Sequence, residues 1–165
     1  MVKRDMITVN AATYDDLTYI GSWLCDEDRE ELALTRDPDD YVSLANDAWE
    51  SKFKFVALDE ATPVMAFGAK ASKNFAVVWG FKTERGWPAV RSVTKFIRRT
   101  MIPALHKAGV YRAVCAVNPG NAVSQAWLRH LGFVPRATTR DIGTRHGEVI
   151  LFERIDNREP ARQPR

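Results

Sequence analysis

The apolar positions of the first 50 residues predict one strand followed by two helices. Thr13 with Asp16 three residues later is typical of a helix start, because the two side chains can cap each other's backbone N–H groups. The spacing of apolar residues after this pair is helical. The predicted elements are a strand at 6–9, a helix at 17–24, an acidic segment at 25–31 and a second helix that opens at Pro38 and Asp39.

The period of the apolar positions changes between residues 53 and 82. Aromatic and β-branched residues there predict three antiparallel strands, with turns at 61–63 and 72–74. A long helix is then predicted from Pro88, since proline suits the first helical turn. Pro103 lies inside the apolar stripe of this helix, so we expect the helix to kink or split there.

The last third of the chain predicts a strand, a helix and two more strands. Gly109 ends the long helix, and a strongly apolar stretch follows it. The predicted elements are a strand at 110–117, a helix at 121–131 and strands at 135–142 and 148–155. This order indicates an α/β protein with a mixed sheet.

The length of 165 residues predicts one domain, which we assign to residues 1–155. Residues 156–165 are charged and almost without apolar side chains, so we expect a disordered tail. Charge is unevenly distributed along the chain, since the formal net charge is −9 over residues 1–60 and +12 over residues 61–165.

The segment from Ala116 to Phe133 resembles the GCN5-related N-acetyltransferase superfamily. In that superfamily a strand is followed by Asn, a small residue three positions on, and Gly-Phe eleven and twelve positions on, which here are Asn121, Ser124, Gly132 and Phe133. The resemblance implies a mostly antiparallel central sheet, flanked by helices, whose fourth and fifth strands splay apart.

The resemblance also implies acetyl-coenzyme A as the acyl donor. The family's phosphate-binding loop precedes the long helix, and Arg85 and Gly86 match its start. Trp87, Pro88 and Val90 then replace small residues, so backbone N–H groups are less open to phosphate than at an ordinary helix start. Side-chain charge from Arg85, Arg91 and Lys95 is the alternative source of phosphate binding. The predicted cofactor-binding residues are Arg85, Gly86, Arg91, Asn121 and Ser124.

The predicted catalytic residues are Glu84 and Asn121. A carboxylate is needed to take a proton from the attacking amine, and Glu84 follows the central strand. The other candidates for this base are Asp26, Glu27 and Asp28. Leu128 stands seven positions after Asn121, where many family members have a tyrosine that protonates the leaving thiolate.

The two cysteines, Cys25 and Cys115, lie far apart and have no Cys or His at metal-ligand spacing, so no metal site is predicted. Their small number favours a reducing compartment, and no apolar run is long enough to span a membrane. We therefore expect a cytoplasmic protein.

Three functions are consistent with the sequence. The first is acetyl transfer from acetyl-coenzyme A to an amine of a small molecule or a protein. The second is binding of a protein partner by a catalytically degenerate chain, similar to small acetyltransferase-like proteins of tailed bacteriophages, in the host cytoplasm or the virion. The third is nucleic-acid binding by Arg91, Lys95, Arg98 and Arg99, which the lack of interleaved aromatic residues disfavours.

Overall fold

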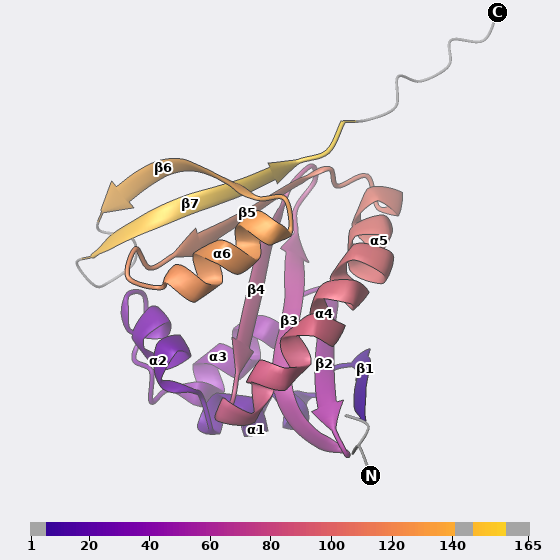
Figure 1. Cartoon of the computed structure of the whole chain (residues 1–165), viewed down its shortest axis with the longest axis vertical. Helices are drawn as coiled ribbons and strands as arrows, with labels where there is room; N and C mark the ends of the chain where they lie inside the picture. The colour runs from indigo at the N-terminus through magenta and orange to yellow at the C-terminus, as the bar shows by residue number, and fades with distance from the viewer. Residues whose placement is uncertain (1–5, 141–146, 158–165) are drawn as a thin grey trace, which may run out of the picture.

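A computed structural model describes residues 6–140 and 147–157. Its central feature is a seven-stranded sheet with the order β1-β2-β3-β4-β5-β7-β6 (Figure 1). All neighbouring strands are antiparallel except β4 and β5, which are parallel. The strands are β1 (Ile7–Ala11), β2 (Phe53–Asp59), β3 (Thr62–Ala71), β4 (Ala76–Lys82), β5 (Arg112–Val117), β6 (Val134–Arg140) and β7 (Glu148–Ile155).

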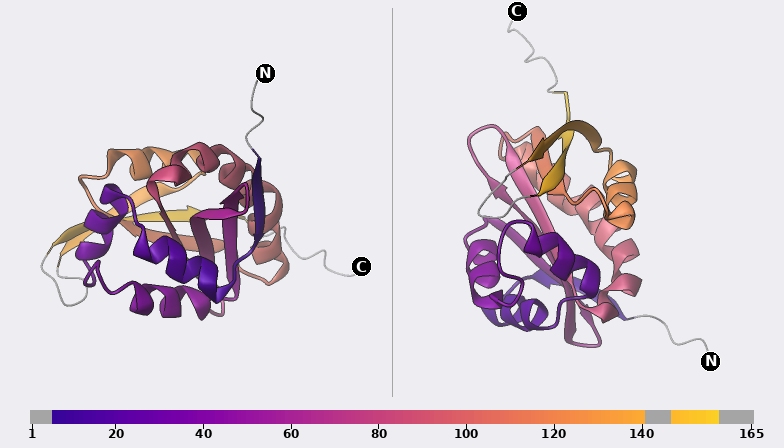
Figure 2. Two further views of the ribbon diagram at one scale, coloured as in Figure 1. Left: turned by 90° about the horizontal axis from the view of Figure 1, so that it is seen from below. Right: turned by 90° about the vertical axis from the view of Figure 1, so that its left-hand side faces the viewer.

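Helices cover both faces of the sheet, as the two views of Figure 2 show. On one face lie α1 (Tyr14–Ser22), α2 (Asp26–Ala33) and α3 (Tyr41–Trp49). On the other lie the 3-10 helix η1 (Glu84–Ala89), α4 (Val90–Phe96), the π-helical turn η2 (Ile97–Met101), α5 (Ile102–Lys107) and α6 (Ala122–His130). Apolar side chains fill the space between each helical layer and the sheet, with Phe67 and Phe152 buried under α4–α6 and Leu17 and Ile20 buried under α1.

The predicted helix signals are confirmed. Thr13 and Asp16 form a reciprocal capping box at the start of α1. The Asn121 side chain accepts the N–H of Ser124 at the start of α6. Gly132 follows α6 at a φ of 89°, a conformation that favours glycine, and Phe133 is buried in the core.

The parallel strands β4 and β5 pair over only two residue pairs, Ala76 with Ala113 and Val77 with Val114. Beyond these pairs the strands diverge, so their C-terminal ends lie apart (Figure 1). The predicted splay between the fourth and fifth strands is therefore confirmed. The backbone of each strand beyond Val77 and Val114 needs other hydrogen-bond partners.

The prediction of two helices between the first two strands is wrong, because the acidic segment is itself helical. The helix α2 (Asp26–Ala33) carries Asp26, Glu27 and Asp28 in its first turn, where the helix dipole favours negative charge. Apolar periodicity could not reveal this helix, since its only fully buried residue is Asp28.

Prolines shift several predicted boundaries. Pro63 lies within β3 and not in a turn, at a register shift between Ala57 and Leu58 where a missing N–H is tolerated. Pro88 lies in η1, one 3-10 segment before the α-helix begins. Near Pro103 the long helix changes to π-helical over Ile97–Met101 and resumes as α5. The expected interruption is thus a π-turn.

The final strands match the prediction closely. β7 spans Glu148–Ile155, and β6 spans Val134–Arg140, while the predicted end of this strand at Ile142 lies outside the described residues. Asp156, the first residue of the predicted tail, donates its N–H to the carbonyl of Tyr111, at 2.8 Å. Among the helices of the described residues, none is long and apolar enough to cross a membrane.

Candidate active site

The opening between β4 and β5 is bridged by α2. The carboxylate of Asp28 accepts the backbone N–H of Lys82, the last residue of β4, at 2.7 Å. The carboxylate of Glu31 accepts the backbone N–H of Asn118, the residue after β5, at 2.7 Å. Asp28 and Glu31, one helical turn apart, therefore accept backbone N–H groups at the points where β4 and β5 no longer pair with each other.

Asp28 also forms a buried ion pair with Lys82. The Lys82 Nζ lies 3.3 Å from one carboxylate oxygen, and both side chains are about nine-tenths covered. The same ammonium lies 4.1 Å from the ring centroid of Trp87. The backbone completes the contact, because the N–H of Cys25 donates to the carbonyl of Lys82 at 2.9 Å. Asp28 thus fixes the start of α2 to the end of β4.

Glu31 is half-buried and makes no ion pair among the described residues. Besides Asn118, it accepts the side-chain N–H of Asn121, at 3.3 Å. Burial raises the pKa of its carboxyl above the ordinary 4.5, and the two hydrogen bonds oppose that shift while the nearby charge of Asp28 adds to it. A carboxylate with a raised pKa at the mouth of an opening has the properties of a general base.

A cavity of about 320 Å³ passes through the opening between the strands. On the α2 side it is lined by Asp28, Glu31 and Thr35, and on the other side it extends between the sheet and helices α5 and α6. Its walls are mostly apolar. Burial raises the pKa of Cys115, which lines this cavity beside Glu31, to about 12, so the thiol is protonated at neutral pH.

A smaller cavity of about 60 Å³ lies between η1 and the start of α6. It shares Asp28, Gly80, Ser124 and Trp127 with the lining of the larger cavity. Trp87 forms part of its wall, and the Trp127 indole N–H donates to the Thr94 hydroxyl, at 2.8 Å. The two cavities therefore meet near Ser124.

One of the predicted site residues lines this junction, and a second contacts an acid that lines the larger cavity. Asn121 caps α6 and donates to Glu31, so it joins the predicted helix start to the acid on α2. Ser124 lines both cavities. Its hydroxyl has no hydrogen-bond partner within residues 6–140 and 147–157. Leu128, at the position of the family's tyrosine, is buried and lines the larger cavity.

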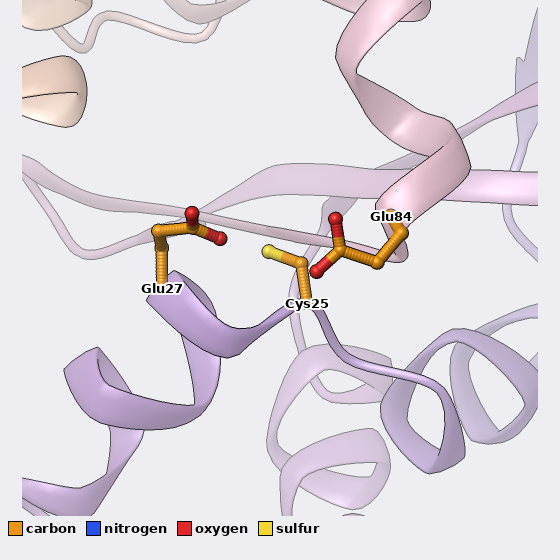
Figure 3. Close-up of side chains that lie close together, drawn as sticks. All are labelled: Cys25, Glu27 and Glu84. Carbon is orange, nitrogen blue, oxygen red and sulfur yellow. The ribbon is translucent and has the colours of Figure 1, made fainter.

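Glu84 lies in a different place. It is exposed at the start of η1, and its carboxylate accepts the N–H of Asp26, at 3.3 Å, which caps α2. Figure 3 shows Glu84 and Glu27 on either side of the Cys25 thiol, with the three ligand atoms within 4.8 Å of one another. Burial raises the pKa of Cys25 to about 12, and the charge of Asp28 contributes. Two of the three groups are exposed carboxylates, which commonly lie together without a metal ion, so this cluster by itself supports no metal assignment.

The three predicted phosphate-binding residues before and on α4 are not brought together with the cavities. Arg85 is exposed and pairs with Asp59, at 3.1 Å. Gly86 is buried with its backbone against the sheet, where an added Cβ would lie 2.6 Å from the Val64 carbonyl oxygen. Arg91 is exposed on α4. Glycine at position 86 is therefore explained by close packing alone.

Sequence reasoning missed Glu31 and Lys82. Asp28 and Glu31 are three positions apart, a spacing that places both acids on one face of a helix, but the sequence predicts no helix over 25–31. The contact of Glu31 with Asn121 joins residues 90 positions apart, which no local pattern could reveal.

The sheet is open and mixed, its parallel pair β4 and β5 parts over a cavity, and an Asn-capped helix follows β5. This arrangement is the acyl-coenzyme A N-acyltransferase class of fold. The more particular match is the fold of the GCN5-related N-acetyltransferases. Many solved structures of that family resemble this chain over nearly its whole length.

The crystal structure of the ribosomal-protein-S18-alanine N-acetyltransferase from Escherichia coli matches with a TM-score of 0.70 and 16% identity, covering 96% of this chain and 99% of that chain. Ard1 from Thermoplasma volcanium matches with a TM-score of 0.69 and 14% identity, covering 92% and 99%. The Salmonella typhimurium protein yncA, solved with its cofactor acetyl-CoA, matches with a TM-score of 0.63 and 12% identity, covering 95% and 98%.

Identities this low establish the fold alone. No protein-family model matches the sequence. A search of curated proteins also finds no match. The predicted similarity to bacteriophage proteins stays a prediction.

Proposed function

We propose that this protein is an N-acyltransferase that moves an acyl group from an acyl-coenzyme A, acetyl-CoA in the simplest case, to an amine of a small molecule or a protein. The observation that carries this proposal is the position of Glu31. This acid with a raised pKa lies at the opening between β4 and β5, beside the helix that Asn121 caps.

In the proposed reaction the amine nitrogen bonds to the thioester carbonyl carbon, and the carbon–sulfur bond breaks. The amine loses one proton to Glu31, and the coenzyme A thiolate gains one from solvent. The products are an amide and a free thiol. Glu31 suits the first transfer, because burial raises its pKa towards the pH at which a carboxylate is an effective base.

The donor's pantetheine arm is assigned to the smaller cavity, which begins beside η1 and reaches Ser124. Asn121 positions Glu31, and the Ser124 hydroxyl contacts the thioester. The donor phosphates are assigned to the side chains of Arg85 and Arg91, outside the cavities, where Arg85 exchanges its partner Asp59 for phosphate. Gly86 allows η1 to pack against the sheet. Pro88 offers no N–H, so side-chain charge supplies most of the phosphate binding.

Glu84 remains a second candidate for the base. It lies on η1 next to α2, and its exposed carboxylate caps Asp26. The Glu84 carboxylate lines neither cavity, whereas Glu31 lines the larger one. Comparing Glu84→Gln with Glu31→Gln in one activity assay separates the two assignments.

An exposed aromatic surface supports a second function, binding of a protein partner. Tyr19 on α1, Trp23 directly after α1 and Tyr41 on α3 are 41%, 66% and 41% exposed. Exposed aromatic side chains are enriched at interfaces. Under this hypothesis Trp87 closes the smaller cavity permanently, and the chain is a degenerate relative of the acetyltransferases. Recovery of no partner from a bacterial lysate, together with clear acyl transfer, would contradict it.

The experiment that tests the enzymatic proposal is a calorimetric titration with acetyl-CoA, followed by a thiol-release assay with a panel of amines. We expect saturable binding and amine-dependent release of coenzyme A. Ser124→Trp fills the junction of the cavities and abolishes both signals, while Ala126→Trp on the exposed side of α6 leaves both unchanged. Absence of binding by the wild-type chain at about 1 mM acetyl-CoA contradicts the proposal.

A further inference from the structure

The larger cavity extends well beyond the opening between the strands. From Ser124 it continues along β5, between the sheet and helices α5 and α6. The walls of this extension are apolar side chains contributed by Met101, Ile102, Leu105, Val110, Leu128 and Leu131. None of these side chains takes part in the proposed proton transfer, so the extension serves some other purpose.

The size of the cavity exceeds what an acetyl group needs. At about 320 Å³ it lies in the range of pockets that hold a whole small ligand. The thioester and the amine occupy the part of this space beside Glu31 and Ser124, and the extension along β5 has room for an acyl chain longer than acetyl.

The far end of the extension is polar, and its charged side chains are paired with one another. His106 Nε2 lies 2.8 Å from a carboxylate oxygen of Asp156. Arg154 donates to the same carboxylate at 3.2 Å and to the Leu131 carbonyl at 2.8 Å. Burial opposes ionisation of Asp156, yet these hydrogen bonds together lower its pKa below 3.8. The cationic side chains that line the cavity among the described residues, His106, Arg112 and Arg154, each face an acid, so none of them is free for a second carboxylate at the end of an acyl chain.

We propose that the acyl group carried to the amine is a straight alkyl chain of medium length. Its thioester lies beside Ser124 and Glu31, and its methyl end points along β5 towards His106. The inference rests on the proposed acyl transfer and adds the class of donor. It follows from the apolar walls, since each methylene moved from water into such a cavity tightens binding by roughly fourfold at most.

Unreactive donor analogues test this inference separately from the proposed function. Coenzyme A and its S-ethyl, S-butyl and S-octyl thioethers are titrated into the full chain by calorimetry. We expect affinity to rise at least tenfold from S-ethyl to S-octyl. Constant or falling affinity along the series, with coenzyme A itself bound, overturns the inference and leaves the proposed function standing. Absence of binding by all four compounds contradicts both.

A cavity-filling variant gives a second readout. Ala113, on β5, is half-buried and lines the extension, so Ala113→Leu shortens it. We expect S-octyl binding to weaken at least tenfold and S-ethyl binding to stay within threefold of wild type. Ile102→Phe fills the same space from the helix side and covers the case in which Ala113→Leu fails to fold. Ala126→Leu on the exposed side of α6 is the matched control, and equal weakening of both thioethers in the cavity variants overturns the inference.

Discussion

Asp28 and Glu31 lie one turn apart on α2, and each accepts the backbone N–H at the end of one of the two strands that part, at 2.7 Å in both cases. The helix therefore bridges the opening with two carboxylates of different character. Asp28 has a lysine partner, whereas Glu31 is held by amides. We infer that the first carboxylate holds the structure and the second performs the chemistry.

Glu31→Gln tests the chemical role. Glutamine keeps the shape but cannot accept the amine proton, so we expect kcat to fall by about 100-fold or more while binding of the acyl donor stays within about threefold. Steady-state kinetics with saturating amine measure the effect. Glu30→Gln, an exposed neighbour on the same helix, is the control and should behave as wild type. A Glu31→Gln variant with nearly full kcat would remove Glu31 as the base.

The raised pKa of Glu31 also predicts a dependence of stability on pH. Because its pKa in the folded chain lies above the ordinary 4.5, the folded state binds its proton more tightly than the unfolded state. This contribution to the free energy of unfolding is fully present at pH values below the pKa of Glu31 in the unfolded chain. It is lost as the pH rises through the pKa of Glu31 in the folded chain. The free energy of unfolding of wild type should therefore fall relative to Glu31→Gln over this interval. Urea denaturation of both proteins at a series of pH values measures this difference in the free energy of unfolding. A wild type that becomes more stable than Glu31→Gln as the pH rises contradicts the raised pKa of Glu31.

Asp28→Asn tests the structural role. The change leaves the ammonium of Lys82 buried without a counter-charge, so we expect the free energy of unfolding to fall by about 3 kcal/mol. The double variant Asp28→Asn with Lys82→Met removes the unpaired charge and should recover most of this loss. Asp26→Asn, an exposed acid on the same helix, should change stability by less than about 1 kcal/mol. Equal stability of Asp28→Asn and wild type would show that the pair contributes nothing.

Trp87 narrows the smaller cavity, which is only about 60 Å³. If the donor's pantetheine arm passes through this cavity, the Trp87 indole must first move. The apparent affinity for the donor is then the intrinsic affinity multiplied by the fraction of molecules in which the indole has moved. We expect Trp87→Ala to bind coenzyme A roughly tenfold more tightly than wild type. Calorimetry measures the change, with the exposed Trp49→Ala as the control. Weaker binding by Trp87→Ala would mean that the indole contacts the donor directly.

Most of the fold could be predicted from the sequence because its signals are local. The caps at Thr13 and Asn121, the glycine after α6 and the alternation of the strands each depend on residues a few positions apart. The helix α2 was missed because it is polar around most of its surface, and its stability comes from contacts with β4 and β5.

The candidate site was only half predictable for the same reason. Asn121 and Ser124 were predicted from their spacing; Ser124 lines both cavities, and Asn121 donates to Glu31, which lines the larger one. Glu31 depends on a contact between distant parts of the chain, and Glu84 was favoured only because it follows a strand. A resemblance in sequence can locate a helix start, but burial decides which acid faces the cavity.

The central claim is that an acyl-coenzyme A lies in the opening that α2 bridges. The most direct measurement is the change in backbone amide NMR shifts as coenzyme A is titrated into isotopically labelled protein. We predict saturable shifts at the amides of Lys82, Asn118 and Ser124, which border the opening. Shifts confined to other surfaces, or no shifts at about 1 mM coenzyme A, would contradict the claim.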